Sequence, residues 1–180
     1  MDARAISGPT IILRSGNYFD LQDPSASRFE VSDIAHALSN ICRFTGHTQR
    51  FYSVAEHSVI CSHMVPPEDA MAALMHDASE AFIGDVSTPL KSLLPDYKSV
   101  EHRVEQAVWS RLGLPPTLPP SVKVADRRAL AVEQRVCMGN GDDWGYGEPT
   151  DDDCALIRFL SPEDARAAFF ARYHYIRCAS

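Results

Sequence analysis

Apolar residues recur every three or four positions over most of the chain, and this spacing predicts helices. The helices are expected over about 34–43, 53–66, 67–84, 96–113, 121–138 and 161–175. Their starts carry residues that cap helices or favour a first turn, such as Asp33, Ser53 and Pro67. Helices joined by short connections pack as a bundle, so we expect an all-α fold.

Three segments fall outside this helical pattern. Residues 10–14 (TIILR) favour a β-strand, and residues 28–31 (RFEV) are expected to pair back on them as a small N-terminal hairpin. The stretch Asn140–Asp153 is acidic and contains glycine, which predicts a loop or mobile flap.

The length of 180 residues fits a single domain. Along residues 1–180 we distinguish four parts, in chain order: an N-terminal hairpin and turn segment (1–32), a helical core (33–138), an acidic loop (139–160) and a C-terminal helix (161–180). No repeat, low-complexity tract or linker divides them.

Composition narrows the classes of function. The 24 acidic and 17 basic side chains leave a formal charge of −7. We expect no nucleic-acid polymer as partner, because proteins that bind one usually present a basic face; a small anionic ligand remains compatible. No apolar run approaches the roughly 20 residues of a membrane span, and no signal-peptide core follows Met1–Ala5. The five cysteines form no CxxC pair, so reduced thiols and a cytoplasmic location are expected.

The most informative segment is His76-Asp77-Ala78-Ser79-Glu80, where ionisable residues interrupt an apolar helix. Charged groups deep in a core need a partner or a metal ion. His76 and Glu80 are four residues apart and are expected on one helix face, with Asp77 able to lean toward a shared ion. His57 on the preceding helix and Asp126 on a later one complete a set that suits Mn²⁺, Co²⁺, Zn²⁺ or Fe²⁺. Such an ion activates water and neutralises charge on a phosphate.

These residues belong to a longer pattern. The chain resembles the HD-domain phosphohydrolases, and is most similar to the small bacterial 5′-deoxynucleotidases and the related phage dATP triphosphohydrolases. The resemblance spans about Ile34–Glu133 and rests on these motifs: Arg43-Phe44, SVAEHS over 53–58, HDxSExxxGDxxTPxK over 76–91, and Ala125-Asp126. It implies an HD-domain helical bundle.

The resemblance also implies roles at the centre of the site. One divalent transition-metal ion would have four ligands: His57, His76, Asp77 and Asp126. Glu80 would orient or deprotonate the attacking water. Asp85 would help to position that water or a sugar hydroxyl, unless it merely caps the turn after Gly84.

Other residues are candidates for substrate binding. By the resemblance, Arg43 would bind phosphate, since a guanidinium can do so bidentately; a plain ion pair with a carboxylate is the alternative. Phe44 stands where family members often have tryptophan, which leaves sugar and base selectivity open. Thr88 and Pro89, with the leucine that follows them, would wall the nucleoside pocket. Outside the strict H…HD…D signature, four residues are further candidates as phosphate donors or for electrostatic steering: His36, His47, Arg50 and Lys91.

We therefore expect metal-dependent hydrolysis of the 5′-phosphate ester of (deoxy)ribonucleotides. A 5′-deoxynucleotidase acting on dNMPs is the first choice, and a dNTP triphosphohydrolase that releases triphosphate is the second. A non-catalytic nucleotide sensor is a third reading, disfavoured because a pure binder needs no water-activating carboxylate at Glu80. Besides the nucleotide, the expected partner is a second copy of the chain, because related enzymes assemble as oligomers and the aromatic C-terminal helix could supply the contact.

Overall fold

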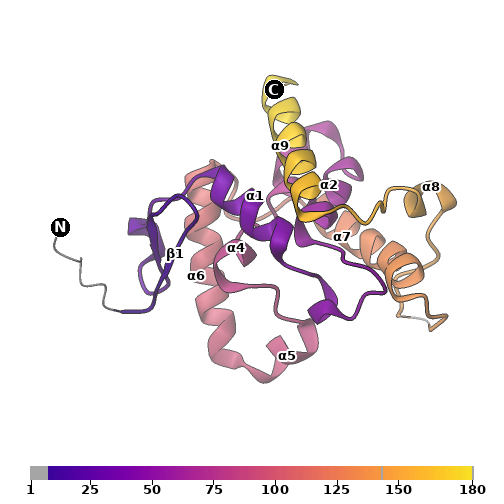
Figure 1. Cartoon of the computed structure of the whole chain (residues 1–180), viewed down its shortest axis with the longest axis horizontal. Helices are drawn as coiled ribbons and strands as arrows, with labels where there is room; N and C mark the ends of the chain where they lie inside the picture. The colour runs from indigo at the N-terminus through magenta and orange to yellow at the C-terminus, as the bar shows by residue number, and fades with distance from the viewer. Residues whose placement is uncertain (1–7, 143, 180) are drawn as a thin grey trace.

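The computed structural model describes residues 8–142 and 144–179. The part described is mainly helical, with a two-stranded hairpin at one end and the short helix α8 near the other (Figure 1). The strands are β1 (Thr10–Ile12) and β2 (Tyr18–Asp20). The helical elements are, in chain order, η1 (Pro24–Ala26), α1 (Val31–Asn40), η2 (Phe44–Gly46), α2 (Val54–His63), η3 (Pro67–Asp69), α3 (Ala70–Leu74), α4 (Glu80–Ile83), α5 (Thr88–Leu93), α6 (Pro95–Leu112), α7 (Pro120–Glu133), the π-helical turn η4 (Gln134–Met138), α8 (Asp151–Cys154) and α9 (Pro162–Ala179). The expected all-α bundle with a small N-terminal hairpin is confirmed.

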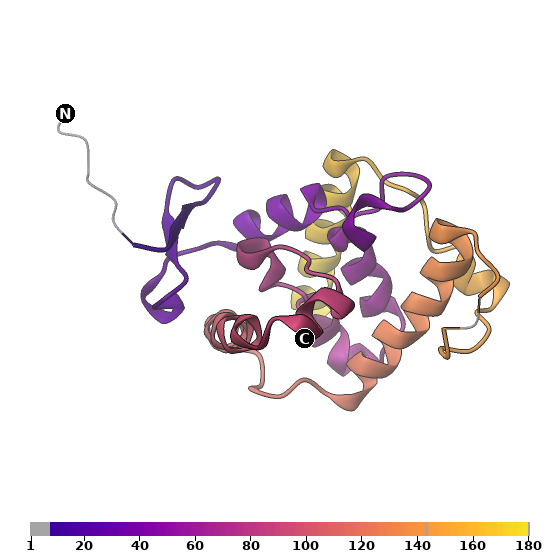
Figure 2. The same cartoon turned by 90° about the horizontal axis from the view of Figure 1, so that it is seen from below.

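Helix α2 lies in the middle of the bundle and packs against α1, α3, α7 and α9 (Figure 2). Most of its residues are buried, so its polar side chains need partners inside the protein. The carboxylate of Glu56 accepts hydrogen bonds from three consecutive backbone N–H groups, at 2.7, 3.0 and 2.8 Å, in residues 158–160. These bonds fix α2, and with it His57, against the segment that leads into α9.

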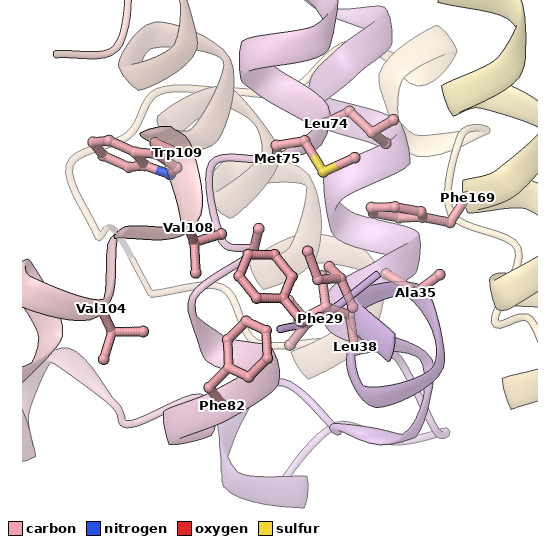
Figure 3. Packing of buried hydrophobic residues seen from close by; sticks show 14 of the residues in the cluster. Phe29, Ala35, Leu38, Leu74, Met75, Phe82, Val104, Val108, Trp109 and Phe169 are labelled. Carbon is pink, nitrogen blue, oxygen red and sulfur yellow. The ribbon is translucent and has the colours of Figure 1, made fainter. Parts of the chain in front are cut away.

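The hydrophobic core packs against one side of residues 75–80, which we call the HD segment because they contain His76 and Asp77. Figure 3 shows Phe29 beside Phe82, with ring centroids 5.1 Å apart. Met75 and Ala78 of the HD segment are completely buried in the same core. Burial of a large apolar side chain contributes about 1.5–3 kcal/mol to stability. With these two residues anchored, His76 and Asp77 project from the other side of the segment.

The expected strand pairing is wrong. Strand β1 pairs antiparallel with β2, Ile11 opposite Phe19, and residues 28–31 form no strand. The turn between the strands contains Gly16 at φ 82°, a left-handed conformation that glycine adopts without strain. A short turn also loses less entropy on closure than a longer loop, so the nearer segment becomes the partner.

The expected continuous helix over 67–84 is also wrong. Helix α3 ends at Leu74, and a chain of turns runs to Ser79 before α4 begins. Inside these turns His76 Nδ1–H donates to the carbonyl of Ala73 at 2.8 Å, a local bond that competes with regular helical pairing. His76 and Glu80 therefore do not share a regular helix face. The turns, and not a helix, set the directions of their side chains.

Helix α1 covers Val31–Asn40 and not 34–43. The chain then extends, and Cys42 forms a β-bridge with Ser53. Arg43 thus leaves the helix, and its side chain lies away from that of His36, whose Nδ1 is 3.1 Å from Arg14 Nη1 beside the hairpin. His36 is not a residue of the cleft described below.

Two further segments contain helices where the sequence predicted none. The acidic loop 139–160 contains helix α8, whose first turn is capped by Thr150 Oγ1 accepting from Asp153 N–H at 3.2 Å. The expected pocket wall at residues 88–90 is the start of α5, with Pro89 in its first turn. Among the residues that the structure describes, no helix is long and apolar enough to cross a membrane.

Candidate metal centre and active site

Side chains from α2, from the turns at residues 75–79 and from α7 converge on one point. Nε2 of His57 is 3.3 Å from Nε2 of His76 and 3.3 Å from Oδ1 of Asp126. Oδ2 of Asp77 is 3.2 Å from His76 Nε2 and 3.6 Å from His57 Nε2. Donor atoms that surround one cation at about 2.1 Å are separated by about 3.0–3.4 Å. The four side chains thus have nearly the spacing of a single coordination shell.

Both histidines have their other ring nitrogen occupied. His76 Nδ1–H donates to the Ala73 carbonyl, and His57 Nδ1–H donates to Oε1 of Glu133 at 2.6 Å. If both imidazoles were neutral, each would turn a lone pair on Nε2 toward the other, which is unfavourable unless a positive charge lies between them. Hydrogen bonds of this kind commonly orient histidines that bind a metal. The donor set fits a divalent cation.

The charges of the cluster formed by His57, His76, Asp77 and Asp126 also favour a bound cation. Burial acts to lower the pKa of His76, but Asp77 outweighs burial and raises it to about 9. Burial acts to raise the pKa of Asp77, but the two imidazoles hold it far below its ordinary value. The cluster thus stabilises positive charge, which can be supplied by protons or by a metal ion that displaces them.

Cys61 joins this cluster, although sequence analysis assigned it no role. Its Sγ lies 3.5 Å from Nε2 of His57, one helical turn earlier on α2, and it is completely buried. His57, Cys61, His76 and Asp126 each offer a ligand atom within 4.8 Å of the others. The four-residue spacing from His57 was the available signal in the sequence.

Glu133 is a second residue that sequence analysis missed. It is completely buried and accepts from Arg43 Nη2–H at 3.0 Å, from the Tyr52 hydroxyl at 2.9 Å and from His57 Nδ1–H. Burial alone would lower the pKa of Arg43, but the carboxylates of Glu133 and Asp77 raise it, so the guanidinium stays charged. Glu133 thus connects Arg43 to a histidine of the cluster.

The position of Glu133 has a simple origin in the sequence. It follows Asp126 by seven residues, two turns of α7, so both carboxylates lie on the same side of that helix. Asp126 is half-buried at the cluster, whereas Glu133 lies behind the ring of His57. One face of α7 therefore supplies a carboxylate on each side of this imidazole.

Glu80 lies beside the cluster without a partner for one oxygen. Its side chain is buried, and among the residues described Oε2 accepts no hydrogen bond. Burial, and then the charges of Asp77 and Asp85, raise the pKa of Glu80 to about 9. Burial also raises the pKa of Asp85, against the effects of Arg43 and Lys91. Strongly shifted carboxyl groups in a cleft are typical of functional sites.

The raised pKa of Glu80 predicts a stability effect in the metal-free protein. Between pH 4.5 and about 9, the folded state retains a proton that the unfolded state has lost, so stability falls as the pH rises. Because glutamine does not titrate, Glu80→Gln removes this loss of stability. With a chelator present at pH 8, the variant should be more stable by at least about 1 kcal/mol, or about 2–4 °C in Tm. Thermal scans at pH 8 and pH 4.5 check this: the gain should vanish at pH 4.5, and equal Tm values at pH 8 would contradict the shifted pKa.

Asp77 and Asp126 of the cluster line a cavity of about 650 Å³. A volume of roughly 300–1,000 Å³ is usual for small-molecule sites. The expected substrate residues that line it are Arg43, Phe44, His47, Thr88, Pro89 and Lys91, together with Asp85. Arg50 is not among the lining residues and stacks over the ring of Phe159, 4.5 Å from its centroid. Lys91 is paired with Glu101 at 2.5 Å.

The cavity also has apolar and aromatic lining residues. Leu130 and Met138 line it from α7 and η4, and Trp144 and Tyr146 line it from the loop after η4. None of these four was a candidate from the sequence. The cavity thus combines charged side chains with aromatic rings.

Comparison with known proteins assigns the chain to a family. The family model described as "5′-deoxynucleotidase YfbR-like" matches residues 10–136. The chain is 42% identical over 163 residues to the uncharacterized protein YfdR of Escherichia coli K12, covering 89% of this chain and 91% of that one. It is 35% identical over 184 residues to the uncharacterized protein RCAP_rcc00048 of Rhodobacter capsulatus, covering 90% and 92%. The match contains all the residues of the cluster, and the chain belongs to the YfbR-like family of HD-domain, metal-dependent phosphohydrolases.

Proposed function

We propose that this protein is a 5′-deoxynucleotidase that hydrolyses deoxynucleoside 5′-monophosphates with one divalent metal ion. The ion would be held by His57, His76, Asp77 and Asp126. The observation that carries the proposal is the buried, unpaired oxygen of Glu80 beside this cluster, on the lining of a nucleotide-sized cavity. A carboxylate in that position is suited to accept a proton from water.

A divalent ion at this cluster would act as a Lewis acid toward phosphate oxygens and lower the pKa of water. Its positive charge would also favour the ionised form of Glu80, against the burial that raises the pKa of that group. Glu80 accepts a proton as water attacks phosphorus. The bond from phosphorus to the 5′ oxygen breaks as Glu80 gives that proton to the leaving oxygen, and the products are inorganic phosphate and a nucleoside.

Arg43 holds the phosphate in this mechanism. It lines the cavity, and Glu133 keeps it charged and fixed. A guanidinium can donate two parallel hydrogen bonds to phosphate oxygens, which orients the phosphorus as well as stabilising its charge. Asp85, at the edge of the same cavity, is placed to accept from a sugar hydroxyl or from water.

The charge of the cavity favours one phosphate over three. Its lysine and arginine lining residues are Arg43 and Lys91, and Lys91 is already paired with Glu101. Asp77, Asp85 and Asp126 add negative charge to the same walls, and Glu80 adds more once a bound ion favours its ionised form. A triphosphate would bring more negative charge than these cations can offset. A dNTP triphosphohydrolase is therefore the second candidate.

A panel of substrates and metals tests the proposal. Purified protein is stripped with a chelator and assayed with dNMPs, NMPs and dNTPs, with Mn²⁺, Co²⁺, Zn²⁺ or Mg²⁺ added back. We expect stripped protein to be inactive, and a transition metal to restore release of inorganic phosphate from dNMPs. Triphosphate release from dNTPs alone would establish the second candidate. Tight nucleotide binding without turnover under every metal would instead identify a sensor.

A further inference from the structure

The cavity has aromatic lining residues that the proposed hydrolysis does not use. Phe44, from η2, and Trp144, from the loop after η4, have ring centroids 6.1 Å apart at an interplanar angle of 43°. Both rings line the cavity, as do Leu130 and Met138. The family match ends at residue 136, so Trp144 lies outside the part of the chain that the family model covers.

We infer that Phe44 and Trp144 form the surface on which the nucleobase of the substrate stacks, and that Trp144 selects nucleotides over base-free sugar phosphates. This inference rests on the proposed function, because it assigns the base-binding part of the same cavity. Phosphate would thus bind beside the metal cluster, and the base on the two aromatic rings.

The ring geometry determines how a base can bind. A base held between two parallel rings needs a gap of about 7 Å, twice the usual stacking distance of roughly 3.5 Å. Phe44 and Trp144 are tilted toward each other and too close for that arrangement. They therefore make one continuous aromatic wall, and the base stacks on its cavity side.

Phe44 is held in position at a cost to its backbone. Its φ is 53° and that of Thr45 is 54°, a left-handed region that bulky residues rarely adopt. Residues kept in such conformations cluster at functional sites. The Arg43 guanidinium lies 5.6 Å from the centroid of the Phe44 ring. Consecutive residues thus present the phosphate donor and the aromatic wall.

The elements that carry the two rings are tied together. Gln49, just after η2, donates from its backbone N–H to the Cys137 carbonyl at 2.9 Å and from Nε2–H to the Met138 carbonyl at 3.3 Å. Gln134 Nε2–H donates to Asn140 Oδ1 at 3.2 Å, at the start of the loop that leads to Trp144. These hydrogen bonds therefore hold the two chain segments that carry Phe44 and Trp144.

This surface predicts tolerance among bases. Every base has a π-face, and stacking recognises that face and not the hydrogen-bonding edge. Purines have the larger face, so they should gain more from the wall than pyrimidines. Truncation of one stacking ring weakens binding by about 5- to 100-fold.

The test compares Trp144→Ala with Trp144→Phe on two substrates: dAMP, which has a base, and 2-deoxyribose 5-phosphate, which has none. Trp144→Ala should raise KM for dAMP about 5- to 100-fold with little change in kcat, and leave both constants for the base-free substrate unchanged. Trp144→Phe should restore most of the loss. Equal effects on the two substrates, or no effect on either, would overturn the inference.

A binding measurement separates this inference from the proposed function. The chain has two tryptophans, and Trp109 is buried in the core. In a Glu80→Gln background, dAMP should quench the emission of Trp144, and 2-deoxyribose 5-phosphate at saturation should not. Trp144→Phe should abolish the quenching, while Trp109→Phe should retain it. Quenching without hydrolysis by the wild-type protein would refute the proposed function alone, whereas hydrolysis without quenching would refute this inference alone.

Discussion

Glu80→Gln should lower kcat for deoxynucleoside 5′-monophosphates by about 10²–10⁴, the usual contribution of a positioned general base. The amide has nearly the shape of the carboxylate but cannot accept the proton of the attacking water. The unpaired Oε2 of Glu80 already lies in a buried position, so the substitution removes a chemical capacity and not a structural contact. Steady-state kinetics with the metal-loaded variant measure the effect.

The control for this prediction is a glutamate outside the cavity. Glu105 on α6 is half-buried and burial raises its pKa, as it does that of Glu80, but it does not line the site. Glu105→Gln should keep wild-type kcat. Metal content should equal that of the wild type in both variants. If Glu80→Gln turned over substrate at the wild-type rate with a full complement of metal, Glu80 would not be the base.

Glu133→Ala should weaken metal binding about 10- to 100-fold and destabilise the protein by about 3–5 kcal/mol. The first effect follows because Glu133 orients His57 through its Nδ1–H, and loss of such a partner reduces metal affinity by that factor. The second follows because Arg43 would be left buried without its main counter-charge. Calorimetric titration of the stripped protein with Zn²⁺ and denaturant unfolding measure the two effects separately.

Tyr52→Phe is the matched control for Glu133→Ala. It removes one hydrogen bond, from a neutral donor to the same carboxylate, and leaves the bonds of Glu133 to Arg43 and His57 in place. We expect a loss of about 1.5–3 kcal/mol in stability, since the acceptor is charged, and metal affinity close to that of the wild type. If Glu133→Ala bound the metal as tightly as Tyr52→Phe, Glu133 would have only a structural role.

The candidate ligands could be predicted because each stands out locally. His76 and Asp77 interrupt an apolar run, and the motif links them to His57 and Asp126. The helix around them could not be predicted correctly. The apolar periodicity continues through residues 75–79, and nothing in it reveals that the side chain of His76 would bond to the Ala73 carbonyl and replace the helix by turns.

Glu133 and Trp144 were missed for a different reason. Glu133 is one of several charged residues on its helix, and its partners Arg43 and Tyr52 are 90 and 81 residues away. Only the packing of α7 against α2 shows that Glu133 is buried whereas the other charged residues of the helix are not. Trp144 lies in a segment whose acidic composition predicts solvent exposure, and its contact with Phe44 depends on the course of the loop.

The most direct test of the account is a crystal of the protein soaked with Co²⁺ and measured at the cobalt absorption edge. We predict one anomalous peak per chain, about 2.0–2.2 Å from Nε2 of His57 and of His76 and from carboxylate oxygens of Asp77 and Asp126. A peak elsewhere, or none between these side chains in a protein that is active with cobalt, would contradict the metal centre on which the proposed hydrolysis depends.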